Sequence, residues 1–311
     1  MKKTLYFLIF IGLIGPAKET AAQPISQVFY AQNYWMPNKP AFGFTGQLES
    51  WWTEINASGV KYIRVGGKAY DGSGMWPIPT LLGIIDTIRA RGFEPIIQVP
   101  IKINLSVAQN AIDNAAIISD INVTNAKNIV YWEIGNEPDG SYSGVNNYHT
   151  NPIIADYIKQ VSTAMKGVLG QSGIKIIGPC LSYYDFPKYA SFLGGADNIT
   201  GSGANGYYID YVGFNTYPFS KAQLQAGTAR QDIINYVNSP FQFDDILDTI
   251  NARIALVGRT GSLKPFVTEV NISAYQDNTN ATTRGPIGVG PKFFRRTILG
   301  GNDGKRNGKA S

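Results

Sequence analysis

VYWEIGNEP, residues 130–138, is the stretch of sequence that decides the fold. Its first part is aromatic and β-branched and too short for a typical helix, which predicts a buried strand over residues 129–134. The glycine and proline that follow are residues that end strands. Asn136 and Glu137 lie between them, so the strand presents an amide and a carboxylate at its carboxyl end.

The same kind of apolar run recurs along the chain. Further strands are predicted over residues 28–34, 61–65, 94–99, 174–177, 209–214 and 265–269. Helical periodicity is visible between them, with apolar residues three and four apart in the stretches 81–88, 153–165 and 246–256. Strand starts that are 33 to 56 residues apart fit βα units that feed a parallel sheet.

Seven such units predict the α/β class and leave two architectures. One is a TIM (β/α)8-type barrel whose C-terminal eighth βα unit is missing, and the other is an open, doubly wound sheet. The second is disfavoured because no glycine-rich phosphate loop follows the first strand. Polar residues follow the carboxyl ends of several strands, which is where barrels carry their chemistry. We therefore expect a barrel that forms one domain over residues 23–290.

The amino-terminal end differs from this body. Residues 1–22 have the pattern of a secretory signal peptide, with Lys2 and Lys3 ahead of an apolar run over residues 5–14. That run is shorter than the roughly 20 residues that span a bilayer. We therefore expect an exported protein, secreted or periplasmic, that has no membrane anchor once the signal is removed.

The carboxyl-terminal end is also unusual. Residues 291–311 form a basic tail with no helical periodicity and no eighth strand pattern. They are either a natural tail or the product of a shifted reading frame. A set of codons for residues 295–305 exists that, read one base later, encodes the start of an amphipathic helix. Sequencing the gene distinguishes the two interpretations.

Charge and composition exclude several classes of function. The formal net charge is +5, but residues 1–22 contribute +2 and residues 292–311 contribute +5, which leaves −2 on the body. We therefore expect no nucleic-acid partner. Because Cys180 is the one cysteine, no internal disulfide forms. With His149 as the one histidine, there is little basis for a zinc site.

Three motifs together resemble a known group of enzymes. They are WEIGNEP at the fourth predicted strand, Asn215-Thr-Tyr217 at the sixth and Thr268-Glu269 at the seventh. The ordered set resembles the clan A retaining glycoside hydrolases, (β/α)8 enzymes that include cellulases, mannanases, β-xylosidases and β-glucuronidases. The resemblance extends over residues 28–290. It implies an oligo- or polysaccharide substrate and no cofactor or metal.

The resemblance implies that Glu137 is the acid/base and Glu269 the nucleophile. Retention of configuration needs two carboxyl groups about 5–5.5 Å apart, one that attacks the anomeric carbon and one that protonates the leaving oxygen. Strands four and seven lie on opposite sides of an eight-stranded barrel, so their ends face each other across the barrel mouth. Glu133, four residues before Glu137, competes for the acid role, and the alternative for it is an ion pair within the barrel.

The resemblance also implies supporting residues. Asn136 resembles a donor to the sugar 2-hydroxyl, or else it caps a turn. Arg64 matches the arginine that keeps the nucleophile ionised, or else it forms a structural ion pair with another acid. Tyr217 is expected to donate a hydrogen bond to the nucleophile. Many members of the clan have histidine where this chain has Asn215, so the role of that residue stays open.

Further residues near the predicted strand ends are candidates for the sugar subsites. Gln98 ends the third strand and Trp35 follows the first, and both are expected to bind or support the substrate. Trp76 and Tyr184 lie in loops on the same face and are candidates for stacking on sugar rings. The alternative for each of them is packing within the fold.

These features predict a secreted retaining glycoside hydrolase that cleaves β-glycosidic bonds by double displacement with two glutamates. The alternative is a non-catalytic or defective secreted barrel that binds carbohydrate without turnover. The missing eighth unit favours this alternative, because an open barrel exposes two sheet edges. Hydrolysis of aryl β-glycosides separates the two functions.

Overall fold

The computed structural model describes residues 31–35, 52–67, 70–71, 74–102, 104–140, 150–219, 231–232, 235 and 242–270. These residues contain a seven-stranded sheet in which neighbouring strands are parallel. In chain order the strands are β1 (Ala31–Trp35), β2 (Tyr62–Gly66), β3 (Glu94–Val99), β4 (Tyr131–Ile134), β5 (Lys175–Leu181), β6 (Tyr211–Thr216) and β7 (Lys264–Val270).

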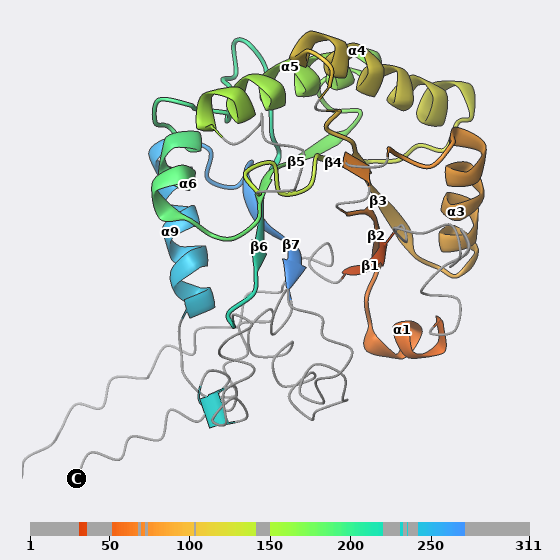
Figure 1. The fold of residues 1–311 in the computed structure, drawn as a ribbon, viewed down its shortest axis with the longest axis horizontal. Helices are drawn as coiled ribbons and strands as arrows, with labels where there is room; N and C mark the ends of the chain where they lie inside the picture. Colours follow the sequence, from red (N-terminus) through yellow and green to blue (C-terminus); the bar gives the residue numbers. More distant parts are fainter. Residues whose placement is uncertain are drawn as a thin grey trace, which may run out of the picture.

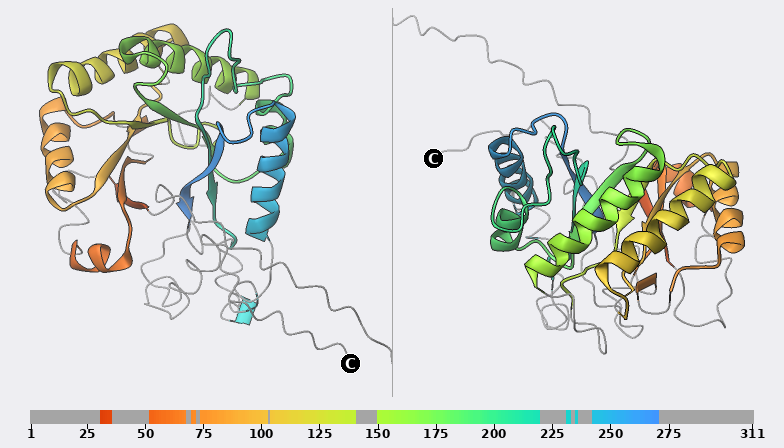
Figure 2. Two further views of the ribbon diagram at one scale, coloured as in Figure 1. Left: turned by 180° about the vertical axis from the view of Figure 1, so that it is seen from behind. Right: turned by 90° about the horizontal axis from the view of Figure 1, so that it is seen from above.

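The sheet curls around an axis and helices cover its outer face (Figure 1). The helices are α1 (Trp52–Ser58), α3 (Ile78–Ala90), α4 (Val107–Ile118), η3 (Ser119–Thr124), α5 (Asn151–Leu169), α6 (Phe186–Phe192) and α9 (Gln242–Leu256). Helices α4 and α5 pack side by side, as the view from above in Figure 2 shows.

The order of strands in the sheet is the same as their order in the chain. A doubly wound sheet reverses its strand order partway, whereas a barrel does not. The doubly wound alternative is therefore wrong, and the prediction of a TIM-type α/β barrel fold is confirmed. The predicted signal peptide, the basic tail and the expected lack of an eighth unit concern residues outside those described. No helix in the described part of the chain is long and apolar enough to cross a membrane.

Each of the seven predicted strands is present, with ends displaced by four residues at most. The largest displacement is in β5, which continues through Gly178-Pro179 to Leu181. A register shift against β6 between Pro179 and Leu181 accommodates the extra residue as a bulge. The pairing of β6 with β7 shifts its register in the same way between Phe214 and Asn215. Both irregularities lie at the carboxyl end of the sheet.

The predicted helical stretches lie within α3, α5 and α9. Their apolar stripes face the sheet, as Ile84, Ile85 and Ile88 of α3 do. Helix α4 was not among the predictions, because the amides of Asn110 and Asn114 interrupt its buried face and weaken the periodic signal.

Inside the curl, side chains stack in layers contributed by alternate strands. Tyr62, Tyr131 and Tyr211 begin β2, β4 and β6, and their rings contact one another at centroid distances of 5.3 and 5.9 Å. An apolar layer of Ile96, Ile177 and Phe266 from β3, β5 and β7 packs against them. Such alternation is the packing rule of barrel interiors. The two layers form a floor beneath the polar residues at the carboxyl ends of the strands.

Candidate active site

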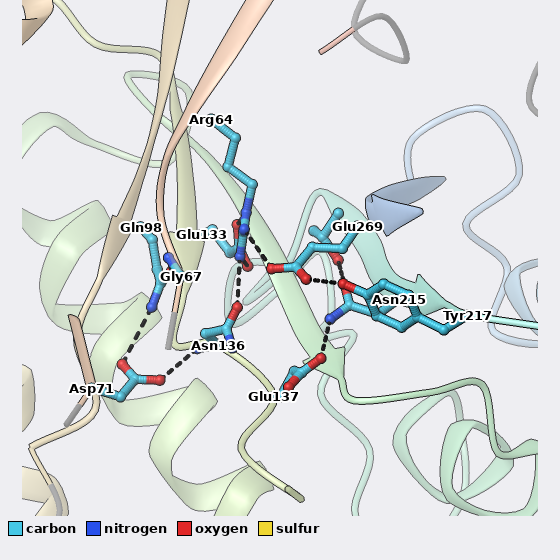
Figure 3. A network of polar contacts seen from close by, with 11 residues as sticks. Arg64, Gly67, Asp71, Gln98, Glu133, Asn136, Glu137, Asn215, Tyr217 and Glu269 are labelled. Atoms are coloured by element: carbon cyan, nitrogen blue, oxygen red, sulfur yellow. Dashed lines mark hydrogen bonds and ion pairs between the residues drawn. The ribbon is translucent and has the colours of Figure 1, made fainter. Parts of the chain in front are cut away.

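The carboxyl ends of the strands carry a connected group of polar side chains (Figure 3). The structure brings together seven of the residues predicted from the sequence, and these are Arg64, Gln98, Asn136, Glu137, Asn215, Tyr217 and Glu269. They come from β2, β3, β6 and β7 and from the turn after β4. Trp35 is the last residue of β1, and its side chain lies outside the described part of the structure.

Arg64 is the hub of the group. Its Nε and Nη2 donate to the two carboxylate oxygens of Glu133 at 2.5 and 2.6 Å, and its Nη1 donates to Glu269 Oε1 at 2.8 Å. Nη2 also donates to Asn136 Oδ1 at 2.9 Å. Burial acts to lower the pKa of Arg64, but the carboxylates Glu133 and Glu269 raise it well above its ordinary value. Arg64 is therefore a permanent cation that joins β2, β4 and β7.

Glu269 receives hydrogen bonds on both carboxylate oxygens. Arg64 donates to Oε1, and the hydroxyl of Tyr217 donates to Oε2. Burial, together with the negative charge of Glu269, raises the pKa of Tyr217, so the hydroxyl keeps its proton and acts as a donor. Glu269 is 6% exposed. The two donors hold this buried carboxylate in one orientation.

Glu137 is held from a different direction. The amide Nδ2 of Asn215 donates to Glu137 Oε1 at 2.7 Å, and the hydroxyl of Thr268 donates to Asn215 Oδ1 at 2.6 Å. Thr268 thereby fixes which end of the Asn215 amide faces the carboxyl group. Glu137 is only partly buried, in contrast to the buried Glu269.

The backbone around Glu137 is strained. Its φ of 48° lies in the left-handed region, which costs a non-glycine residue about 1–3 kcal/mol. Hydrogen bonds oppose this cost: Glu137 N donates to Cys180 O at 3.0 Å, and Gly140 N donates to Glu137 O at 2.8 Å. Gly135 is required two residues earlier, because its φ is 71° and a Cβ there would collide with the side chain of Ile101.

Glu133 does not lie in the same environment as Glu137. It is fully buried, and Arg64 occupies both of its carboxylate oxygens. Burial raises the pKa of Glu133, and the charge of Arg64 opposes that shift. The arrangement matches the ion pair within the barrel that the sequence suggested as the alternative role for Glu133.

Gln98 has a supporting position. It is fully buried, its Oε1 accepts from Gly67 N at 2.5 Å and its Nε2 donates to Asp71 at 3.3 Å. Both ends of the amide are thus engaged within the protein. Gln98 therefore holds the loop after β2 rather than facing a sugar.

Two aromatic residues pack within the fold, which was the alternative to stacking on a sugar. Trp76 is 1% exposed and packs edge-on against Tyr70 with centroids 5.7 Å apart. Tyr184 is partly buried, stacks on Tyr189 at 5.2 Å and packs against the main core.

Two residues of the network have no place among the sequence predictions. Asp71, in the connection after β2, accepts hydrogen bonds from Ile101 N and Asn136 N at 2.8 Å each. Thr268 belongs to the Thr-Glu motif, but no role was predicted for it. Strand alternation turns Thr268 and Glu269 to opposite faces, and the register shift beside Asn215 brings both to the same site.

The fold is shared with glycoside hydrolases. A bacterial orthologue of human α-L-iduronidase superposes with a TM-score of 0.51 at 11% identity, over 80% of this chain and 42% of that chain. A Paenibacillus polymyxa xyloglucanase of glycoside hydrolase family 44 superposes with a TM-score of 0.50 at 11% identity, over 81% of this chain and 67% of that one. This chain thus spans less than half the length of the first structure. No protein-family model and no curated protein matches the sequence.

Proposed function

We propose that the protein is a retaining glycoside hydrolase that cleaves β-glycosidic bonds, with Glu269 as nucleophile and Glu137 as acid/base. The observation that carries the proposal is the convergence of both carboxyl groups on one strand end. Asn215 donates to Glu137, and Tyr217, two residues later, donates to Glu269. Asn215 is also the register partner of Glu269 across β6 and β7. Two carboxyl groups held in this way are the equipment of double displacement.

The first chemical step forms a glycosyl-enzyme. The carboxylate of Glu269 attacks the anomeric carbon while the bond from that carbon to the leaving oxygen breaks. Arg64 and Tyr217 donate hydrogen bonds to this carboxylate and fix its orientation before attack. Both donors lie within the fold, so they require little reorganisation when the charge moves.

Glu137 supplies the proton that the leaving oxygen takes up. Because Asn215 Nδ2–H occupies Oε1, the acidic proton of Glu137 resides on Oε2. The carboxylate left behind then removes a proton from water, which attacks the anomeric carbon and releases Glu269. The products are the free sugar and the leaving alcohol, and both glutamates return to their starting forms.

Asn136 is proposed to contact the sugar 2-hydroxyl. Its Oδ1 accepts from Arg64 Nη2 at 2.9 Å, which fixes the orientation of the amide and directs Nδ2, a donor, elsewhere. A hydrogen bond to the 2-hydroxyl strengthens in the transition state of these reactions. The resemblance of the WEIGNEP stretch to clan A enzymes supports this role.

The substrate is proposed to be an oligo- or polysaccharide outside the cytoplasm. The pattern of a signal peptide in residues 1–22 supports export. A xyloglucanase among the structures that share the fold is consistent with a saccharide substrate.

The test begins with a panel of 2,4-dinitrophenyl β-glycosides and continues with Glu269→Ala on the best of them. We expect hydrolysis by the wild type, loss of activity in the variant, and recovery with azide to give the α-glycosyl azide. Azide enters the space vacated by the nucleophile and attacks from the opposite face to the leaving group, which explains the inverted product. A Glu269→Ala variant as active as the wild type contradicts the proposal.

A further inference from the structure

Asp71 lies on the other side of Asn136 from the proposed acid/base and connects three strands at their carboxyl ends (Figure 3). Its Oδ2 accepts from Asn136 N at 2.8 Å, after β4. Its Oδ1 accepts from Ile101 N at 2.8 Å and from Gln98 Nε2 at 3.3 Å, both from the end of β3. Asp71 itself is helical and belongs to the connection that follows β2.

The connection that carries Asp71 is fixed by the same set of contacts. Gln98 Oε1 accepts from Gly67 N at 2.5 Å, while Gln98 Nε2 reaches Asp71. Gly66 packs so closely against Gln98 that a side chain there would collide with it. Gly67, Gln98 and Asp71 thus form a closed ring of contacts, and the ring presents one carboxylate oxygen to the backbone of Asn136.

The bond to Asn136 N bears directly on Glu137. It fixes the Gly135–Asn136 peptide, and Cys180 O fixes the N–H of the next peptide, Asn136–Glu137. These two peptides share Asn136, and the residue that follows it is Glu137, whose φ of 48° is left-handed. A strained conformation persists only where its surroundings over-determine it. Asp71 anchors the residue before the strained one with a side chain, so this contact can be changed by substitution.

Burying a carboxylate costs free energy, so a side chain that serves packing alone is rarely an aspartate. Asp71 is 9% exposed, and no salt bridge to it is present among the described residues. Its partners are two backbone N–H groups and one amide on two separate oxygens. An asparagine there turns an NH2 group toward one of these donors, because it has one acceptor oxygen in place of two.

We propose that Asp71 is a positioning residue for the acid/base, which it serves by holding the Gly135–Asn136 peptide so that the Glu137 carboxyl group meets the leaving oxygen. The inference rests on the proposed function. Asp71 does not touch the substrate, and its effect is transmitted through the backbone of Asn136.

The experiment compares substrates whose leaving groups need acid assistance with substrates that do not. Asp71→Asn is assayed on the 2,4-dinitrophenyl and the phenyl β-glycoside of the sugar that the wild type prefers. The first leaving group departs without protonation and the second does not. We expect kcat/KM to fall about 10- to 100-fold for the phenyl glycoside and less than threefold for the dinitrophenyl glycoside.

The ratio of kcat/KM for the phenyl glycoside to that for the dinitrophenyl glycoside distinguishes a positioning role of Asp71 from a role in folding. A variant that is merely less folded loses both activities in proportion, so its ratio equals that of the wild type, and this result overturns the proposal even if little protein is soluble. Asp71→Ser, which is smaller, is expected to give the same selective loss. The control is Asp86→Asn on α3, whose carboxylate accepts from Lys127 Nζ at 2.6 Å and, among the described residues, contacts none of the Asp71 network. Its ratio is expected to stay at the wild-type value.

The activity of the wild type distinguishes failure of the proposed glycosidase function from failure of the role proposed for Asp71. If it hydrolyses none of the glycosides, the proposed function fails and the role of Asp71 fails with it. If it is active and Asp71→Asn keeps the wild-type ratio, the positioning role alone is overturned.

Discussion

Asn215 Nδ2 donates to Glu137 Oε1 at 2.7 Å, and this bond places β6 in direct contact with the turn after β4. Asn215 is at the position where the sequence departs from the histidine that is common in clan A. The amide is oriented by Thr268, whose hydroxyl donates to its other end at 2.6 Å. An amide does not titrate near neutral pH, so Asn215 stays a hydrogen-bond donor whether or not Glu137 carries a proton.

Substitution of Asn215 should impair the acid step selectively. Asn215→Ala removes the donor that assigns the proton to Oε2 of Glu137. We expect kcat/KM to fall about 10- to 100-fold for phenyl glycosides and much less for dinitrophenyl glycosides. Thr268→Val, which leaves the amide in place but unoriented, should cause a smaller loss with the same preference. Equal losses on both substrates would show that Asn215 does not act through the acid.

Removal of the Tyr217 hydroxyl should impair attack by the nucleophile. Tyr217→Phe keeps the ring and deletes the donor to Glu269 Oε2. We expect kcat to fall about 10- to 100-fold with both classes of leaving group, because attack by Glu269 is required whichever leaving group departs. Steady-state kinetics measure this effect, and circular dichroism checks that the fold is kept. An unchanged kcat would remove Tyr217 from the mechanism.

Glu133 should matter for stability. Glu133→Gln leaves Arg64 buried with a single carboxylate partner, Glu269. Loss of one member of a buried ion pair costs about 3–5 kcal/mol, which urea unfolding measures as a lower midpoint. Asp86→Asn is the control, because the Lys127–Asp86 pair has a 60% exposed carboxylate and its loss should cost under about 1 kcal/mol. Similar losses in the two variants would mean that the Arg64–Glu133 pair contributes little.

The sheet was predictable because its strands follow simple local rules. Buried strands of parallel sheets are short apolar runs between turn residues, and each of the seven runs in this chain became a strand. The boundaries failed where the backbone is irregular. Gly178-Pro179 has the pattern of a strand end, yet β5 continues through it by means of a bulge. Helix α4 was missed because Asn110 and Asn114 are buried through hydrogen bonds rather than apolar contact.

The residues of the candidate site that belong to short sequence motifs were predictable. Those whose role depends on contacts with residues far away in the sequence were not. Glu137, Tyr217 and Glu269 belong to short motifs at strand ends. Asp71 lies in the connection after β2, and it accepts backbone N–H groups that follow β3 and β4. Any acceptor in such a connection has the same appearance in a sequence. The sequence could not decide between stacking on a sugar and packing for Trp76, because an aromatic residue near a strand end has the same pattern whether it faces the core or the solvent. The structure buries it.

The stability of the protein should depend on pH through Asp71. Burial raises the pKa of Asp71 from 3.8 to about 7, against the N–H groups of Ile101 and Asn136, which lower it; the charges of Glu133 and Arg64 act in opposite directions. Between pH 3.8 and about 7 the folded protein holds a proton on Asp71 that the unfolded chain has released. The stability that protonated Asp71 contributes is therefore complete below pH 3.8. It is lost as the pH rises to about 7, by up to about 1.4 kcal/mol per pH unit.

Asp71→Asn removes this titration and isolates it from that of the other acids. Urea unfolding of both proteins at several values between pH 4 and pH 8 gives the two free-energy profiles. We expect the free energy of unfolding of the wild type to decline relative to the variant up to about pH 7 and then to run parallel to it. Parallel profiles over the whole range would mean that Asp71 keeps an ordinary pKa, because its three N–H donors then outweigh the cost of burying its charge.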